Sequence, residues 1–333
     1  MTRLSLSSLA LALTLALAAP AFAQDDALTI YTAQHQALTQ EWADAFTART
    51  GIPVVVRKGT DVLMANQIVQ EGLNSPADIF LTENSPAMMM VEDAGLFSPV
   101  APATLANIPE QFRPEGGMWV GIAARTTLFV YNKDMLSEAE LPASLLDLAK
   151  PEWQGRWGAA PAGADFQAIV SALLELRGPD ETANWLVGLK NNALPYRGNF
   201  EAMRGANVGE VAGALIYNYY YYGDQAGTGE SSDKLGTYYF PNKDPGAFIS
   251  VSGGGVLKAS DKPEAAQQFL AFITGPEGQA ILRDGQSYEY AIGSGIDANP
   301  ALPPLSSIDN PDIDASLGNA QEVVQLMTAA GVI

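Results

Sequence analysis

Residues 28–81 read LTIYTAQHQALTQEWADAFTARTGIPVVVRKGTDVLMANQIVQEGLNSPADIFL, and this stretch determines the fold class. It contains three short apolar runs, two of them rich in β-branched residues, separated by two longer segments with apolar residues at helical spacing. The predicted strands are 28–31, 52–56 and 77–81, and the predicted helices are 38–50 and 60–72. This β-α-β-α-β order indicates a sheet that is mostly parallel and covered by helices.

The rest of the chain continues to alternate strands and helices. Two extended runs, 121–131 and 248–257, stand out because each is longer than an average strand. Without a short leader, about 310 residues remain, which is more than one hydrophobic core usually holds. We therefore predict two α/β lobes without a flexible linker, and we expect the two extended runs to cross between them.

The N-terminus has the pattern of a secretory signal peptide over residues 1–23. Arg3 is followed by an apolar run at 4–19 and by the tripeptide AFA at 21–23, a small-x-small cleavage pattern. The run is short for a membrane span, and no later stretch approaches about 20 apolar residues. We therefore expect a periplasmic protein that is secreted through a cleaved signal peptide, with no membrane insertion.

The chain is strongly acidic, with 18 Lys and Arg against 37 Asp and Glu and a net charge of −19. Nucleic acid requires basic side chains to neutralise its phosphates, so the charge argues strongly against nucleic-acid binding and against docking on anionic lipid. The chain contains no cysteine, so burial must hold the fold without disulfides. An acidic surface is compatible with a cationic ligand and with solubility alone.

Two polar side chains follow predicted strands. His35, the only histidine, comes after the first strand, and Glu83 comes after the third. Ligands of open α/β sheets bind beyond the carboxyl ends of the strands, so we expect both side chains at the same edge of the sheet. The alternatives are a surface or helix-capping histidine and a solvated loop carboxylate.

A run of tyrosines follows the predicted strand 212–216. Residues 217–222 read YNYYYY, which places five tyrosines in six positions. Adjacent side chains point in different directions in a helix or a strand, so some of the hydroxyls must be presented away from the core. The alternatives are an aromatic platform for a sugar or peptide, and packing alone.

Together, the histidine, the glutamate and the tyrosines fit a ferric ion better than other metals. Fe(III) is a hard cation that prefers carboxylate and phenolate oxygens and tolerates imidazole. A trivalent ion can displace the phenol proton, although the reference pKa of tyrosine is about 10. Soft metals are disfavoured because the chain has no thiolate ligand, and zinc is disfavoured because its sites usually contain several His or Cys. Calcium is disfavoured because no DxDxDG-type loop is present.

At these residues the sequence resembles the bacterial periplasmic ferric-ion-binding proteins, the solute-binding components of ferric iron ABC transporters. The matching segments are YTAQH at 31–35, SPADIF at 75–80, TE at 82–83, NYY at 218–220, DPGA at 244–247, SG at 252–253 and VLK at 256–258. The resemblance implies a two-lobed periplasmic-binding-protein fold of the type II-like α/β class, with mixed sheets flanked by helices and hinge strands between the lobes. It also implies metal ligation by His35 and Glu83 from one lobe and by Tyr219 and Tyr220 from the other.

The same resemblance implies a function and partners. The protein would bind Fe3+ without catalysis and deliver it, as a monomer, to the membrane permease and ATPase of an ABC importer. We expect an N-lobe of 24–125 plus 250–299 and a C-lobe of 126–249 plus 300–333. A binding protein of the same fold for a polyamine, thiamine or an oxyanion is the alternative. An enzyme is disfavoured because the chain has one histidine, no cysteine and no GxSxG or SxxK motif.

Members of this family often complete the iron shell with a synergistic anion, carbonate or phosphate. Here GAD at 163–165 replaces a Ser-Gly-Ala turn, and Tyr217 stands where an Asn precedes the Asn-Tyr-Tyr run. The candidates for an anion site are Arg125, Gly163, Ala164 and Asn199. Otherwise Tyr217, as a possible extra metal ligand, Tyr221 or water would fill the remaining positions.

Overall fold

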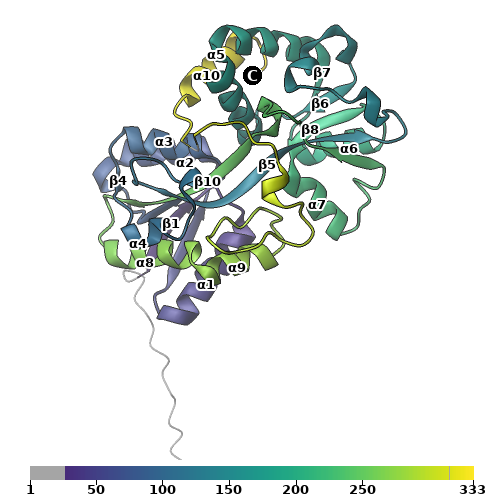
Figure 1. Cartoon of the computed structure of the whole chain (residues 1–333). Coiled ribbons are helices and arrows are strands. Elements are labelled where there is room, and N and C mark those ends of the chain that lie inside the picture. The colour runs from purple at the N-terminus through teal and green to yellow at the C-terminus, as the bar shows by residue number, and fades with distance from the viewer. Residues whose placement is uncertain (1–26, 315) are drawn as a thin grey trace, which may run out of the picture.

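The computed structural model describes residues 27–314 and 316–333 and shows two α/β lobes side by side (Figure 1). The predicted signal peptide, residues 1–23, lies outside the described residues. Within the described part of the chain, no helix has both the length and the apolar character that a membrane crossing requires. The predicted two-lobed α/β fold is confirmed.

The first lobe is built on the predicted β-α-β-α-β unit. Its elements are β1 (Leu28–Thr32), α1 (Gln36–Thr50), β2 (Val54–Lys58), α2 (Asp61–Glu71) and β3 (Ile79–Leu81). Strand β1 pairs in parallel with both β2 and β3, as predicted. Trp42 and Phe46 of α1 are buried, which explains the helical spacing of its apolar residues. Gly51 ends α1 in a left-handed conformation with φ of 78°.

Two long antiparallel strands connect the lobes. They are β5 (Val120–Asn132) and β10 (Ile249–Leu257), and both are buried along their whole length. The sheet order is β2-β1-β3-β10-β5-β8-β6-β7, where β8 is Gly213–Tyr217, β6 is Trp157–Ala159 and β7 is Ala193–Pro195. Strand β5 pairs with β10 through its first half and with β8 through its second half, so it carries the chain from one lobe into the other.

The second lobe carries the longest helix, α5 (Ala164–Asn192). The sequence predicts two helices here, 164–176 and 180–189, and the structure places a kink between them. Gly178 has a φ of 79° and precedes Pro179, which cannot donate a helical hydrogen bond. The last helix, α10 (Ala320–Ala329), packs against α5 and also touches α3 of the first lobe, which is Ser85–Asp93.

The structure contains several further elements. They are β4 (Phe97–Ser98), α4 (Pro102–Leu105), α6 (Asn199–Asn207), α7 (Asn218–Ala226), β9 (Leu235–Tyr238), α8 (Pro263–Thr274) and α9 (Pro276–Asp284). The sequence predicts one of them, a helix at 263–273 that corresponds to α8, and the others are not predicted. Helix α7 matters most, because it begins inside the tyrosine run and fixes the direction of each ring.

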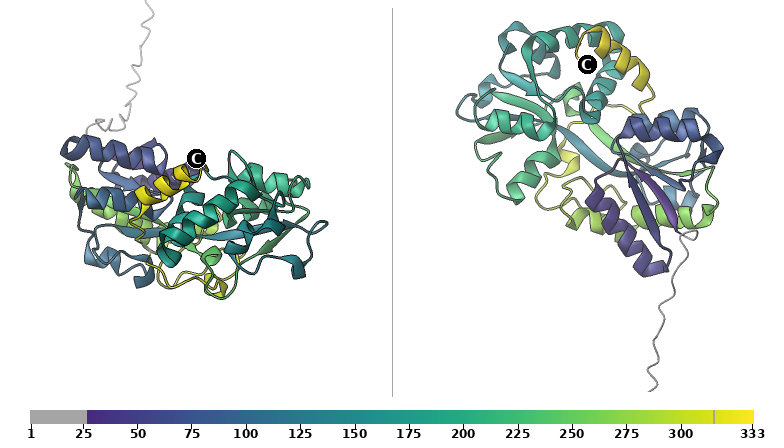
Figure 2. Two further views of the ribbon diagram at one scale, coloured as in Figure 1. Left: turned by 90° about the horizontal axis from the view of Figure 1, so that it is seen from above. Right: turned by 180° about the vertical axis from the view of Figure 1, so that it is seen from behind.

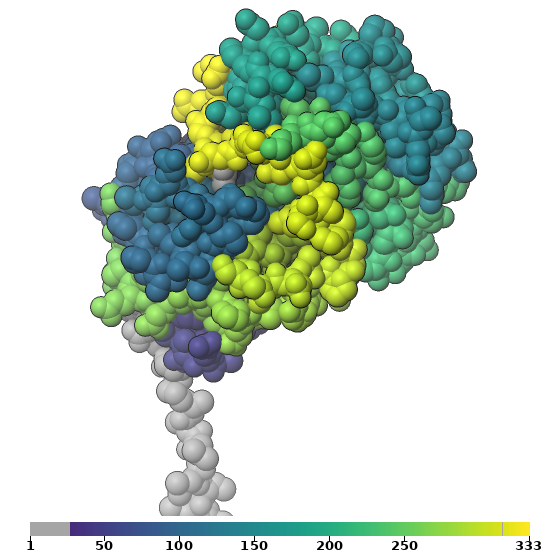
Figure 3. Space-filling model, in the orientation of Figure 1, coloured from purple at the N-terminus to yellow at the C-terminus, as the bar shows by residue number. Residues whose placement is uncertain are grey.

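Each lobe has its own hydrophobic core. Large buried residues include Trp42, Phe80 and Phe269 in the first core, and Trp153, Trp157 and Trp185 in the second. The predicted C-lobe includes residues 300–333, but Leu302 and Ile308 pack in the first core. Their apolar side chains are buried against the first lobe before the chain passes to the second lobe. The C-terminal segment, in yellow, then runs over the face where the lobes meet (Figures 2 and 3).

Candidate metal centre

His35 and Glu83 come together at the carboxyl edge of the first sheet, as expected from their strands. His35 stands at the N-terminal boundary of α1, and Glu83 lies in the short loop between β3 and α3. The buried carboxylate of Asp61 accepts hydrogen bonds from the backbone N–H of Glu83 at 2.9 Å and of Asn84 at 3.0 Å. This holds the loop so that Glu83 Oε1 lies 3.5 Å from His35 Nε2.

The tyrosine pair reaches the same place from the second lobe. Tyr219 and Tyr220 lie in the first turn of α7, directly after β8. The start of this helix is fastened by Asn218, whose Oδ1 accepts from the Thr126 N–H of the hinge strand β5 at 2.8 Å. The ring centroid of Tyr219 lies 4.7 Å from that of His35 and 4.3 Å from that of Tyr220. Residues far apart in the sequence thus converge between the lobes.

Asp165 lies at the centre of this convergence. Its Oδ2 accepts hydrogen bonds from the Tyr219 hydroxyl and from Asn199 Nδ2, both at 2.8 Å, and its Oδ1 accepts from Asn84 Nδ2 at 3.4 Å. It lies in the first turn of α5, where the helix dipole favours a negative charge. Asp165 is not among the site residues predicted from the sequence, where it appears only as the last residue of the GAD segment at 163–165 that replaces a Ser-Gly-Ala turn. The replacement of Ser-Gly-Ala by Gly-Ala-Asp at 163–165 is the sequence feature that could have identified Asp165 as a member of the site.

Arg125 of β5 is the fully buried cation of the site. Its Nη1 lies 3.8 Å from Glu83 Oε2 and 3.7 Å from Asp165 Oδ1, and its Nη2 is hydrogen-bonded to Glu289. The guanidinium carbon lies 5.3 Å from the centroid of the Tyr219 ring. Arg125 was predicted to bind an anion, and the anions that the structure brings to it are carboxylates of the chain itself.

Glu289 is a member of the site that the sequence analysis missed. Its side chain is completely buried, and it lies in a loop between α9 and the C-terminal segment. It contacts Gln34, whose Nε2 donates to Oε1 at 3.3 Å, and His35, whose Nδ1 lies 3.3 Å from Oε2. The chain carries 37 Asp and Glu residues, so nothing in the sequence marks this one.

Burial dominates the ionisation of the candidate ligands. It raises the pKa of Glu83 to about 8, with Arg125 opposing the rise and Asp165 adding to it. Burial and the charge of Asp165 raise the pKa of Tyr220 to about 12, and burial also holds the pKa of Tyr219 well above its usual value. Burial lowers the pKa of the His35 imidazole. A bound cation would therefore displace protons from the oxygen ligands.

The other predicted residues lie close to the site in different roles. Gly163 caps α5 and Ala164 is its first residue, and neither has a side chain that reaches the ligands. Asn199, the first residue of α6, is hydrogen-bonded to Asp165. Tyr217 is fully buried, with its ring centroid 6.3 Å from that of Tyr219, and burial raises its pKa above the usual range.

The donor set determines which metals the site suits. In residues 27–314 and 316–333, no group of three or more His, Cys, Asp or Glu side chains is arranged to hold a metal ion by itself, without other kinds of ligand. A metal centre here must therefore draw on phenol oxygens, which hard, highly charged cations accept. The side chains of His35 and Glu83 are 26% and 24% exposed, so solvent reaches these two candidate ligands.

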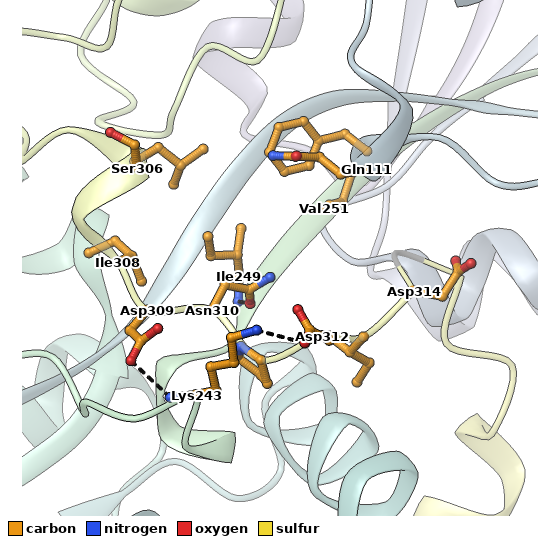
Figure 4. Close-up of a pocket in the computed structure, with 14 residues that line it drawn as sticks. Gln111, Lys243, Ile249, Val251, Ser306, Ile308, Asp309, Asn310, Asp312 and Asp314 are labelled. Atoms are coloured by element: carbon orange, nitrogen blue, oxygen red, sulfur yellow. Dashed lines mark hydrogen bonds and ion pairs between the residues drawn. The ribbon is translucent and has the colours of Figure 1, made fainter.

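A separate cavity, shown in Figure 4, lies behind the hinge strand β10. Its volume is about 480 Å³, and Ile249 and Val251 of β10 line it together with the segment 305–314. Ser250 and Ser252 of the same strand hydrogen-bond instead to Asn84 and Arg125, on the side of the candidate metal site. Because side chains alternate between the two faces of a strand, β10 separates this cavity from the candidate metal site.

Known proteins match both the sequence and the fold. Residues 74–315 match the family described as bacterial extracellular solute-binding protein. The chain is 53% identical to the Fe(3+)-binding periplasmic protein of Serratia marcescens over 325 residues, which cover 98% of this chain and 96% of the relative. It is 34% identical to the major ferric iron-binding protein of Neisseria meningitidis, over 97% of each chain.

A solved structure, iron-bound HitA from Pseudomonas aeruginosa, shares the fold with a TM-score of 0.86 at 41% identity. The match covers 92% of this chain and 99% of that one. The chain therefore belongs to the bacterial extracellular solute-binding proteins and, within them, to the periplasmic ferric-iron-binding proteins.

Proposed function

We propose that this protein captures Fe3+ in the periplasm and delivers it to an ABC importer, without catalysing a reaction. The observation that carries the proposal is the convergence of phenol, carboxylate and imidazole donors from two lobes onto one point. The proposed ligands are His35, Glu83, Asp165, Tyr219 and Tyr220. The relatives named for ferric iron and the similarity to an iron-bound structure support the choice of metal.

The remaining parts of the proposal concern location and partners. Secretion would follow cleavage of the signal peptide at residues 1–23, in agreement with the periplasmic relatives. The partners would be the permease and ATPase of a ferric iron importer. All five proposed ligands come from one chain, which supports a monomer as the binding unit.

We further propose that Asp165 replaces the synergistic anion. The groups predicted to hold carbonate or phosphate, Asn199 and Arg125, already face its carboxylate, at 2.8 Å and 3.7 Å. A protein carboxylate is a hard oxygen ligand, as a bound anion would be. Tyr217 would then support the ring of Tyr219 from behind and would not ligate the metal.

The experiment that tests the function is a titration of the purified mature protein with ferric citrate. Phenolate ligation to Fe(III) should produce a visible charge-transfer band. We expect the double variant Tyr219→Phe/Tyr220→Phe to lose this band and to bind iron more than about 100-fold more weakly, because phenylalanine cannot supply an oxygen ligand.

The matched control is Tyr221→Phe, which removes the next hydroxyl of the same helix. It should keep the band and the affinity of the wild type. An unchanged band in the double variant would show that the assignment of the ligands is wrong.

A further inference from the structure

Glu289 is a buried carboxylate that the proposed ligand set does not use. Its side chain has no exposed surface, and it faces the cation Arg125 and the imidazole of His35 at the same time. Burying a carboxylate is costly unless it is paired and hydrogen-bonded, so its placement against these two groups requires an explanation.

The two oxygens of Glu289 have different surroundings. Oε1 accepts hydrogen bonds from Arg125 Nη2 and Gln34 Nε2. Oε2 accepts none from the described residues, and His35 Nδ1 lies 3.3 Å from it. The opposite nitrogen, Nε2, is the one that faces Glu83, at 3.5 Å. The distance of 3.3 Å is within hydrogen-bond reach, so a reorientation that aligns Nδ1–H with Oε2 would complete this bond.

The loop that carries Glu289 is fixed on both sides. Tyr290 pairs with Ala124 of β5 through two backbone hydrogen bonds, of 2.7 Å and 3.0 Å. Tyr288 has a φ of 53°, a conformation that is rare for a bulky residue, and its carbonyl accepts from Asn218 Nδ2 at 2.9 Å. Strained backbone of this kind persists only where its surroundings hold it in place. The side chain of Glu289 is therefore aimed into the site by a rigid loop.

We propose that Glu289 is a positioning residue, which accepts a hydrogen bond from His35 Nδ1–H and thereby presents the Nε2 lone pair to the ferric ion. This inference rests on the proposed function. The bond made by one ring nitrogen of a histidine determines which nitrogen is free to bind a metal. Carboxylates commonly play this part for metal-ligating histidines. Arg125 forms a hydrogen bond with Glu289 but only longer ion-pair contacts, of 3.8 Å and 3.7 Å, with Glu83 and Asp165, so Glu289 is the carboxylate least available as a ligand.

The single histidine of the chain makes a direct test possible, because the imidazole nitrogens give one set of NMR signals. We expect long-range 1H–15N spectra of the metal-free protein at mildly alkaline pH to show the Nδ1–H tautomer. In Glu289→Ala this preference should disappear. Since the measurement needs no metal, its result is independent of whether the protein binds iron.

Iron binding provides the second readout. We expect Glu289→Gln and Glu289→Ala to weaken ferric binding by about 10- to 100-fold, with the phenolate band kept in position because the tyrosines still ligate. Glu289→Gln retains the size of the side chain but replaces one acceptor oxygen with an NH2 donor, so an amide oxygen held by Arg125 and Gln34 leaves no acceptor for His35 Nδ1–H. The glutamine variant therefore also serves if the alanine variant does not fold. The control is Glu92→Gln. This substitution changes a carboxylate outside the site, which accepts a hydrogen bond from Trp119 Nε1.

Two outcomes would overturn the proposal. The first is a tautomer that is the same in wild type and Glu289→Ala. The second is loss of the phenolate band in the glutamine variant, which would indicate a direct ligand or a collapsed site. Absence of iron binding by the wild type would instead contradict the proposed function, and the tautomer result would remain valid.

Discussion

Asp165 occupies hydrogen-bond donors that an external anion would otherwise use. Tyr219, Asn199 and Asn84 all donate to it, and Arg125 lies close by. Removing a buried acceptor leaves its donors unpaired, at a cost of about 1–3 kcal/mol for each group that water cannot reach. A small anion that enters the vacated space would recover those bonds and supply an oxygen to the metal.

The first prediction follows from this competition. In buffer depleted of carbonate and phosphate, Asp165→Ala should bind ferric iron at least about 10-fold more weakly than the wild type, because one oxygen ligand is lost. Adding carbonate or phosphate should restore much of the affinity of the variant and leave the wild type unchanged. Competition with a coloured chelator measures the iron affinity of the variant and of the wild type, with and without the added anion.

The control for this experiment is Asp180→Ala, which removes an exposed carboxylate from the same helix. It should behave as the wild type in every buffer. A wild-type protein that itself requires added anion would contradict the replacement of the anion by Asp165.

At the scale of the elements, the hinge strand β10 depends on its glycines. A Cβ atom on Gly255 would lie 2.6 Å from the ring of Phe97, which is buried in the first core. A Cβ on Gly254 would meet the ends of three side chains at 3.1 Å, a tight contact that flexible groups can relieve. The backbone of β10 thus approaches the core side chains more closely at Gly255 than at Gly254.

We therefore expect Gly255→Ala to lower the free energy of unfolding by about 1–3 kcal/mol through overpacking, and Gly254→Ala to lower it less. Urea unfolding followed by tryptophan fluorescence measures the difference. The phenolate band of the iron-loaded variants should stay in place. If Gly255→Ala and the wild type unfolded at the same urea concentration, Phe97 would move aside without loss of stability.

The elements also show how far the sequence alone leads. Strands β1 and β3 could be predicted because their short apolar runs are separated by segments with helical spacing, and parallel strands of such a unit place His35 and Glu83 at one edge of the sheet. Helix α7 was missed because a run of aromatic residues has no helical periodicity. Glu289 could not be predicted, because its direction depends on a positive φ at Tyr288, which a tyrosine rarely adopts.

At the scale of the whole molecule, the proposed metal site is also an interface between the lobes. The ring contact of His35 with Tyr219 and the hydrogen bond of Asn84 to Asp165 both join the first lobe to the second. Apart from β5 and β10, the lobes are connected by the C-terminal segment. Lys243 holds this segment, because its backbone N–H donates to Asp309 and its ammonium group donates to Asp312 (Figure 4). Because a bound ion would add ligand bonds from both sides, it should favour the closed arrangement.

The absence of cysteine allows this closure to be measured with pairs of spin labels. Leu73 in the first lobe and Val208 in the second are 68% and 70% exposed, so labels on Leu73→Cys and Val208→Cys should not disturb the cores. We expect iron to narrow the distribution of distances between these labels in the wild-type background and to leave it unchanged with Tyr219→Phe/Tyr220→Phe. A pair within one lobe, Leu73→Cys with Val55→Cys, should not respond to iron. If the distribution between the lobes were the same with and without iron, the ligands would be preassembled and closure would play no part in capturing the metal.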